Sequence, residues 1–182
     1  MVPELRKKYN QQFSDNLYQS YLNELEAKYP VLVESYKIRE DSAGAGEFRG
    51  GLGAEMVVQA LSPFSVTTRI DRMHCKPWGL EGGGEAAGNG IAIRHKGEWS
   101  SDLPNAKVFN VRLERGDAYK MLSGGGGGFG SPFKRDEQAV AFDVREGYVS
   151  REAAEKLYGV VLSDSCEVLQ NETQQLRSKN LA

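Results

Sequence analysis

The amino-acid sequence predicts an α+β protein with a β-rich central core of about six strands and flanking N-terminal and C-terminal helices. Three observations support this class. Apolar residues recur every fourth position at the start of the chain, alternate with polar residues in the middle, and return to helical spacing with good capping residues in the last third. The 182 residues suffice for one good core or two very small ones.

Residues 1–29 are predicted to form a helical N-terminal segment that ends at Pro30. On a straight helix, each step of four residues drifts by about 40°, so seven such steps cannot form one apolar stripe. We therefore expect two helices, or one helix bent near residues 14–16, where good N-cap residues stand. The recurring residues are Leu5, Tyr9, Phe13, Leu17, Tyr21, Leu25 and Tyr29.

Residues 30–132 are predicted to form the β-rich core with its glycine loops, and Ser62-Pro63 and Arg115-Gly116-Asp117 favour turns within it. Six strand-like segments occur there: residues 31–38, 56–61, 64–70, 91–94, 107–113 and 118–122.

Residues 133–162 are predicted to be the helical C-terminal part of the same domain, followed by a polar tail over 163–182 with too few apolar residues to anchor it. One helix is expected over 136–146, with Gly147 as its stop. A second is expected from Arg151 to Tyr158, capped by Ser150 and ended by Gly159, and residues 160–162 are a candidate final strand.

Composition excludes several classes of protein. Lys and Arg number 23 against 25 acidic residues, which argues against a chain built to bind nucleic acid or an anionic membrane. No apolar run reaches the roughly 20 residues that span a bilayer, and the start lacks a secretory segment, so a cytoplasmic location is expected. Only Cys75 and Cys166 are present, which argues against a disulfide framework and excludes a four-cysteine zinc site.

Glycine is the unusual residue, at 21 of 182 positions, and most of it falls in three clusters over 44–53, 79–90 and 124–130. Such clusters indicate backbone that needs positive φ or a close approach. The first could point N–H groups at an anion beside Arg49, but it lacks the Gly-Lys-Ser/Thr of a phosphate loop, so a structural turn is favoured. The last fits a flexible linker and an ordered loop equally well.

The adjacent pair His74 and Cys75 carries a weaker signal. On an extended chain the two side chains point to opposite faces, so one metal ion would not take both, and a catalytic dyad would lack its orienting third group. A redox, metal or nucleophile role is therefore disfavoured, and His95 is expected to be a surface residue.

Several long motifs occur in one order over about residues 25–162: Asp41–Gly53, Cys75–Gly83, Leu113–Asp117, Ser123–Pro132 and Asp143–Leu162. On these motifs the chain resembles the C-terminal part of the hydantoinase B/oxoprolinase family. That family holds the B-type subunits of ATP-dependent N-methylhydantoinase and 5-oxoprolinase, and acetone and acetophenone carboxylases are related to it. Ala43 stands where the family usually has glycine, and family subunits have a large N-terminal portion that these residues do not match.

The resemblance implies a small subunit or C-terminal module of an ATP-dependent cyclic-amide hydrolase, which completes an active site shared with larger partner chains. It implies that ATP and Mg bind to an A-type partner subunit, that a divalent metal could belong to the N-terminal portion of the B type, and that this chain holds no cofactor or metal. The alternatives are a subunit of an ATP-dependent ketone carboxylase and a non-catalytic interaction module or truncated remnant. The isolated chain is expected to be inactive.

Two charged residues beside the first glycine cluster are the catalytic candidates. Asp41 is expected to orient water or a ligand, and Arg49 to steady an anionic intermediate. The residues expected to line a substrate or partner surface are Ser42, Gly44, Gly46, Gly50, Gly51, Gly53, Trp78, Gly126, Gly127 and Gly128.

Overall fold

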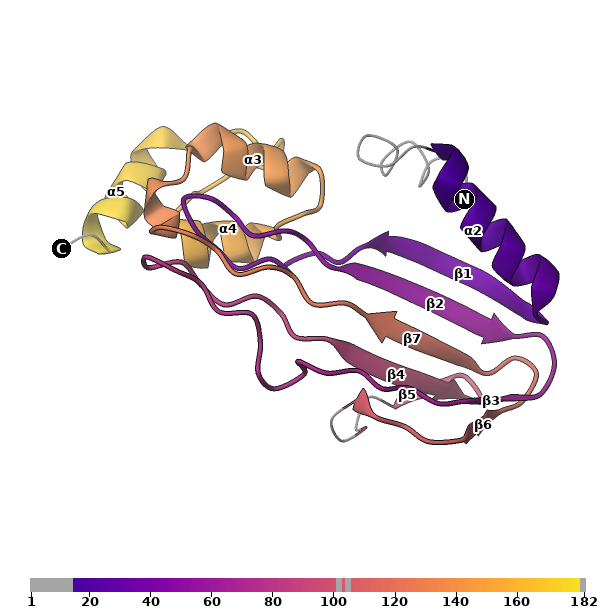
Figure 1. Ribbon diagram of the computed structural model, residues 1–182. Coiled ribbons are helices and arrows are strands. Elements are labelled where there is room, and N and C mark those ends of the chain that lie inside the picture. The colour runs from indigo at the N-terminus through magenta and orange to yellow at the C-terminus, as the bar shows by residue number, and fades with distance from the viewer. Residues whose placement is uncertain (1–14, 101–102, 104–105, 181–182) are drawn as a thin grey trace. The chain divides into compact units, whose positions relative to one another are not determined.

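A computed structural model describes residues 15–100, 103 and 106–180, and it confirms the α+β class (Figure 1). The chain divides into two compact units. Unit 1 takes residues up to Ile38 together with Ala54–His74 and Asn89–Ser123. Unit 2 takes Arg39–Gly53, Cys75–Gly88 and the chain from Gly124 onward.

Unit 1 is built on a five-stranded antiparallel sheet of order β1-β2-β7-β4-β5, and a second sheet pairs β3 with β6 (Figure 1). A bulge interrupts the register of the first strand between Val33 and Ser35. The strands are β1 (Val31–Ile38), β2 (Ala54–Ala60), β3 (Phe64–Val66), β4 (Gly90–His95), β5 (Glu98–Ser100), β6 (Val111–Leu113) and β7 (Ala118–Leu122).

All six predicted strands are present, and β1 and β7 have the predicted bounds. Strands β3 and β6 are shorter than the predicted 64–70 and 107–113, because they pair only with each other, over three residues. Strand β5 was not predicted. All three of its residues are exposed, so it carries no apolar alternation, and it forms by pairing with β4.

The two faces of the large sheet differ in chemistry. One face contributes side chains to a hydrophobic core. Outside that core, Arg94 pairs with Glu34, and its guanidinium carbon lies 5.2 Å from the centroid of the Trp99 ring. Lys120 lies 4.7 Å from the same ring. This division is typical of an antiparallel sheet with one solvated side. The buried core residues are Ala60, Val66, Ile91, Ile93, Ala106, Val108 and Leu113.

Helix α2 (Asp15–Lys28) lies next to β1, and its Glu26 Oε1 accepts a hydrogen bond of 2.8 Å from the Val33 backbone N–H (Figure 1). It begins where the sequence predicted a break or a new helix start. The predicted helical part over residues 1–14 lies outside the described residues.

A buried carboxylate joins two turns of unit 1. Asp117 is 7% exposed and accepts hydrogen bonds of 3.0 Å from the backbone N–H groups of Glu114 and Lys96. Its Oδ2 also lies 2.9 Å from Nδ1 of His95, which is the exposed surface residue expected and makes this one bond besides. The Glu114 N–H, followed by His95, lowers the pKa of Asp117 from 3.8 to about 2.

Asp117→Asn is expected to lower the free energy of unfolding by about 2 kcal/mol at neutral pH, the equivalent of the pKa difference. Because the folded-state pKa is depressed, this stability is present above about pH 5 and is lost as pH falls toward 2. Urea unfolding of both proteins from pH 7 to pH 2 should show a shallower pH dependence for the variant. Asp164→Asn, at an exposed carboxylate, is the control; equal pH slopes for Asp117→Asn and the parent protein would contradict the prediction.

Unit 2 holds the remaining helices: η2 (Pro132–Lys134), α3 (Glu137–Arg145), α4 (Arg151–Tyr158) and α5 (Gln170–Asn180). The predicted caps of α4 are confirmed: Ser150 accepts a hydrogen bond from the Ala153 N–H, and Gly159 ends the helix with φ of 63°. Asp136, predicted as the first helical residue, is instead the N-cap of α3 and accepts a hydrogen bond from the Ala139 N–H. None of the helices in the described part of the chain is long and apolar enough to cross a membrane.

Helices α3 and α4 contribute to a second core that includes Tyr158, which is 2% exposed. Burial disfavours the phenolate and raises the pKa of Tyr158 to about 12. Ala45 belongs to the first glycine cluster and also to this core, so the cluster packs with the helices. The buried members are Ala45, Val140, Val149, Ala154, Tyr158 and Val160.

The polar tail expected over 163–182, with too few apolar residues to anchor much, contains helix α5 as far as Asn180. Helix α5 is polar, but its Thr173 is fully buried and accepts a hydrogen bond of 3.0 Å from the Val161 N–H. Arg177 donates from Nε to the Tyr158 carbonyl over 3.2 Å. Polar bonds thus anchor this segment, and Val168 also packs against the core of unit 2. The candidate strand over 160–162 is reduced to one bridge between Leu162 and Val168.

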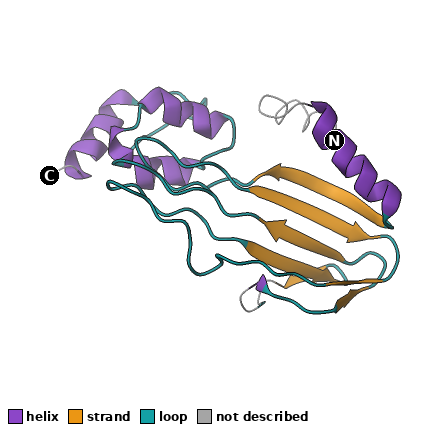
Figure 2. Ribbon diagram, viewed as in Figure 1, coloured by secondary structure: helices purple, strands orange, loops and turns teal. Residues whose placement is uncertain are grey.

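The two compact units do not follow the predicted boundary between the β-rich core and the C-terminal helices at residue 132. Residues 39–53 and 75–88 were assigned to the β-rich core, yet they group with the C-terminal helices in unit 2. Figure 2 shows these glycine-rich segments as loops, not strands. They associate with the third glycine segment through backbone hydrogen bonds, which local sequence patterns do not reveal.

Candidate functional site

The three glycine clusters come together in unit 2. We call this assembly the glycine bundle: residues 42–53, 78–84 and 124–130. The third segment lies at its centre, because the Gly44 N–H donates to the Gly126 carbonyl over 2.9 Å and the Gly126 N–H donates to Gly51 over 2.9 Å. On another side, the Gly128 N–H donates to the Gly84 carbonyl over 3.0 Å.

The central segment has backbone neighbours in several directions. A Cβ added at Gly125 would lie 2.1 Å from the Ser42 carbonyl oxygen, and one at Gly128 would lie 2.0 Å from that of Ala45. At Gly127 the distance to the Trp78 carbonyl oxygen would be 1.8 Å. An ordinary strand has space for side chains above and below the sheet, but this segment has neither. The run of glycines is therefore an ordered, tightly packed segment and not a flexible linker.

Many backbone donors of the bundle are already in use. The N–H groups of Gly44, Gly50, Gly84, Gly126 and Gly128 all donate to backbone carbonyls within the bundle. A phosphate cradle needs N–H groups that point at the ligand. The bundle is thus a scaffold, in agreement with the structural turn favoured for its first segment.

The structure gives Asp41 and Ser42 clear bonding partners. Asp41 has φ of 55°, and its Oδ1 accepts a hydrogen bond of 2.8 Å from the Ser150 N–H at the start of α4. Ser42 is fully buried; its hydroxyl donates to the Arg39 carbonyl and accepts from the Gly53 N–H over 2.8 Å. Both side chains hold the ends of the first glycine segment in place.

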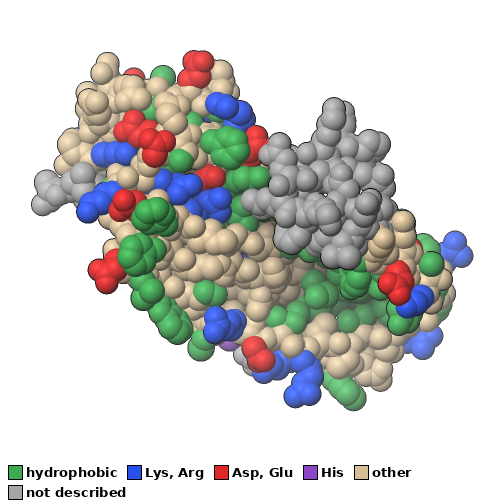
Figure 3. All heavy atoms as spheres, turned by 45° about the horizontal axis from the view of Figure 1, so that its top comes forward, with side chains coloured by type: hydrophobic (Ala, Val, Ile, Leu, Met, Phe, Trp, Pro, Cys, Tyr) green, Lys and Arg blue, Asp and Glu red, His purple; other side chains and the backbone are tan. Residues whose placement is uncertain are grey.

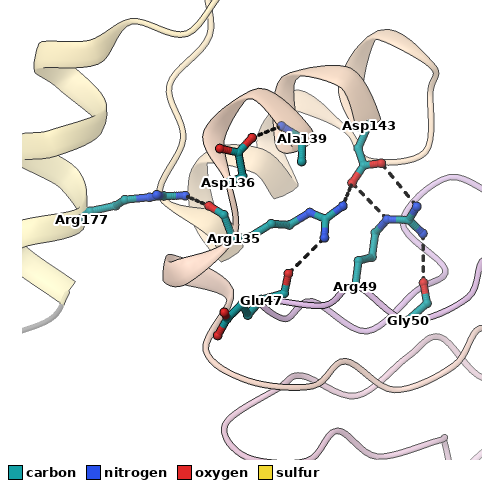
Figure 4. A network of polar contacts seen from close by, with 8 residues as sticks. All are labelled: Glu47, Arg49, Gly50, Arg135, Asp136, Ala139, Asp143 and Arg177. Carbon is teal, nitrogen blue, oxygen red and sulfur yellow. Dashed lines mark hydrogen bonds and ion pairs between the residues drawn. The ribbon is translucent and has the colours of Figure 1, made fainter.

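Arg49 makes a two-point ion pair with a buried aspartate (Figure 4). Its Nε lies 3.0 Å from Asp143 Oδ2, and its Nη2 lies 3.3 Å from Oδ1. Arg135 approaches Oδ2 of the same carboxylate from α3's N-terminal side, with Nη2 at 2.9 Å. Asp143 is 2% exposed, so the two guanidinium groups share one buried carboxylate.

The network extends to further elements of unit 2 (Figure 4). Arg135 donates to the Glu47 carbonyl over 3.1 Å, while Arg177 of α5 donates to the Arg135 carbonyl over 2.8 Å. Arg177 also pairs with Glu137 at 3.3 Å. The network therefore connects the first glycine segment to α3 and α5.

Sequence reasoning missed the network partners of Arg49. A usable signal was present: Asp143 stands three residues after Val140 on the apolar side of the predicted helix, and a charge at such a position needs a partner. Nothing local indicates that the partners are Arg49 and Arg135. The catalytic roles of Asp41 and Arg49 stay predictions; what the geometry adds is that both side chains also stabilise unit 2.

The other predicted lining residues divide into two groups. Trp78 is 72% exposed and a Cβ at Gly51 would meet nothing within 4 Å, so both positions face open space. Gly44, Gly46, Gly50 and Gly126–Gly128 lie against neighbouring backbone. Cys75 is exposed, and among the described residues no three His, Cys, Asp or Glu side chains are grouped as metal ligands.

The fold and the bundle define a class of protein: an α+β module whose glycine-rich segments form a scaffold that carries ion pairs and exposed side chains. The chain belongs to the Hydantoinase B/oxoprolinase family, whose family model matches residues 11–132. The predicted resemblance is confirmed.

Two relatives illustrate the similarity. An uncharacterized protein of Methanocaldococcus jannaschii is 34% identical over 157 residues, which cover 84% of this chain and 27% of the relative. The B-type subunit of a putative D-/L-hydantoinase from a Pseudomonas species (strain NS671) is 30% identical over 168 residues, covering 90% of this chain and 28% of the relative. The chain therefore spans just over a quarter of the length of these relatives.

Solved structures agree with the fold. The ATP-dependent caprolactamase from Pseudomonas jessenii superposes with a TM-score of 0.73 at 26% identity, over 86% of this chain and 28% of that chain. A nucleotide-free acetone carboxylase gives a TM-score of 0.74 at 23% identity, over 88% of this chain and 26% of that chain, which supports the fold alone.

Proposed function

We propose that this chain is a small subunit or C-terminal module of an ATP-dependent cyclic-amide hydrolase, in which it completes an active site shared with larger partner chains. The observation that carries the proposal is the similarity to a B-type hydantoinase subunit across 90% of this chain. The beta subunit of a caprolactamase, 31% identical over 148 residues, is a further relative, and its name indicates a cyclic amide as substrate. The proposal includes the cytoplasmic location expected from the sequence.

The chemistry explains why such an enzyme needs ATP. An unstrained cyclic amide is a poor electrophile. Transfer of the terminal phosphoryl group of ATP to the amide oxygen gives ADP and turns that oxygen into a leaving group. Water then adds to the ring carbon, and the C–N bond breaks as the ring nitrogen takes up a proton. A second water hydrolyses the resulting acyl phosphate to a carboxylate and phosphate. In the proposal, ATP and Mg bind to an A-type partner subunit, and a divalent metal belongs to the remainder of a B-type chain.

This chain supplies position and charge in the proposed assembly. The glycine-rich bundle holds the backbone around Asp41 and Arg49, and rigid placement is what a shared active site requires. The two guanidinium groups of Arg49 and Arg135 share the Asp143 carboxylate, and their positive charge would favour an anionic phosphorylated intermediate nearby.

Alone, the purified chain is expected neither to hydrolyse ATP nor to open a lactam. Combined with an A-type subunit and the remainder of a B-type chain, it should support ADP release that depends on a hydantoin, 5-oxoproline or another lactam. A coupled ADP assay with each compound, with and without this chain, measures the effect. Turnover by the isolated chain, or equal turnover without it, would contradict the proposal.

A second candidate is a subunit of an ATP-dependent ketone carboxylase. It is favoured by an acetone carboxylase alpha subunit of Xanthobacter autotrophicus, 28% identical over 166 residues. The same assay with acetone or acetophenone and bicarbonate separates the two chemistries. If neither cyclic amides nor ketones stimulate ADP release by the assembly, the remaining alternative is a non-catalytic interaction module or truncated remnant.

A further inference from the structure

Three hydrophobic side chains form a row across the glycine bundle, and a fourth, Trp78, stands two residues before one of them. Phe48 and Phe129 are bridged as an antiparallel pair, and Leu80 and Phe129 as a parallel pair. Residues paired in this way place their side chains on one side of the local sheet. The rings of Phe48 and Phe129 have centroids 6.3 Å apart, so they are in contact distance. We call Phe48, Leu80, Phe129 and the nearby Trp78 the hydrophobic row.

The hydrophobic row is open to solvent. Phe48 is 64% exposed, Leu80 58% and Phe129 49%, and Trp78 is the most exposed at 72%. Figure 3 shows hydrophobic side chains following one another along the margin of the part that carries the C-terminal helices. Single exposed apolar residues need no explanation, but a group on adjacent segments marks a contact surface.

The backbone beneath the row is held rigidly. Phe48 and Phe129 exchange two backbone hydrogen bonds of 3.0 Å, and the Leu80 N–H donates to Gly128 over 2.9 Å. Anchors that are already fixed lose little conformational entropy on binding. Large aromatic side chains in such positions are typical anchors of protein interfaces.

We propose that the hydrophobic row is the docking surface for the remainder of a B-type chain, meaning the part of the relatives that these 182 residues do not match. This inference rests on the proposed function. In the relatives, the matched region is only 27–28% of one longer polypeptide, so a large body of protein accompanies it.

The size of the row favours this occupant over a second copy of the chain. A buried aromatic side chain contributes roughly 150–250 Å², so four partly exposed residues offer on the order of 500 Å². A stable pair of separate proteins buries about 800 Å² on each partner. Two copies that met only at this row would fall short, whereas a much larger B-type body can add contacts around it.

The test uses the full 182-residue chain and the B-type hydantoinase relative from Pseudomonas with its matching segment deleted. Size-exclusion chromatography and calorimetry measure the complex. The parent chain should form a one-to-one complex, and Phe48→Ser/Phe129→Ser should weaken it by about tenfold or more. Phe109→Ser, at a side chain 86% exposed in unit 1, is the matched control and should bind like the parent chain. Circular dichroism melts check that each variant is folded.

Each other outcome counts against the inference. Unchanged affinity in the folded double variant, or no complex with the parent chain, overturns it. A concentration-dependent homodimer that the double variant abolishes would assign the row to a second copy instead. The proposed function fails separately, if the complex forms through the row but supports no substrate-dependent ATP hydrolysis with an A-type subunit.

Discussion

Gly50→Ala is expected to lower the free energy of unfolding by about 3 kcal/mol or more, whereas Gly51→Ala leaves it unchanged or raises it slightly. A Cβ at Gly50 would lie 1.9 Å from the Gly126 carbonyl oxygen and 2.5 Å from its carbon. That carbonyl cannot easily move, since it also accepts the hydrogen bond from Gly44. At Gly51 nothing lies within 4 Å, so the next residue is a matched control.

Urea unfolding followed by circular dichroism measures both variants against the parent chain. The comparison is sharp because the same substitution is made at adjacent positions of one segment, so effects on the unfolded state nearly cancel. Equal stability of the two variants would show that the bundle tolerates side chains. The central segment would then be a linker after all.

Asp143→Ala is expected to destabilise unit 2 by about 3–5 kcal/mol. The carboxylate is 2% exposed and bonds to both Arg49 and Arg135, so its removal leaves two guanidinium groups side by side without a counter-charge. Removal of one partner from a buried ion pair costs more than the pair itself contributes, because the remaining charge stays desolvated.

A surface ion pair provides the control for this prediction. Glu152 pairs with Lys156 on α4, but both side chains are at least 70% exposed, so Glu152→Ala should have no measurable effect on stability. The loss of stability for Asp143→Asn should lie between those for Asp143→Ala and Glu152→Ala, because the amide keeps one hydrogen-bond acceptor but loses the charge. Thermal and urea unfolding of the three variants decide the order. A loss below about 1 kcal/mol for Asp143→Ala would mean that the network is solvated.

Local patterns predicted much of this fold. Alternation located β1 and the turn at Arg115-Gly116-Asp117 located β7, both with their correct bounds, and Ser150 and Gly159 marked the ends of α4. These features depend on residues close together in the chain, where spacing and capping act directly. Strand β5 escaped because its three exposed residues have no apolar pattern, and its partner strand alone makes it a strand.

The sequence predicted segments and single residues of the candidate site, but not which of them contact one another. The glycine clusters drew attention to the correct segments, and Asp41 and Arg49 were singled out beside them. Their bonding partners were not foreseen, because Arg49 and Asp143 are separated by 94 positions and no local spacing relates them. The same holds for Thr173 and Arg177, whose polar bonds anchor a helix that looked like a tail.

By itself, the sequence determined the fold class, the bounds of β1, β7 and α4, the family and the unusual density of glycine. Only the tertiary structure decided that the glycine segments surround one another, that one aspartate serves two arginines, and that Phe48, Leu80 and Phe129 share a face. The physical reason is that these features depend on where distant backbones meet. Because glycine has no side chain, a run of glycines shows no apolar or polar alternation from which its neighbours in space could be predicted.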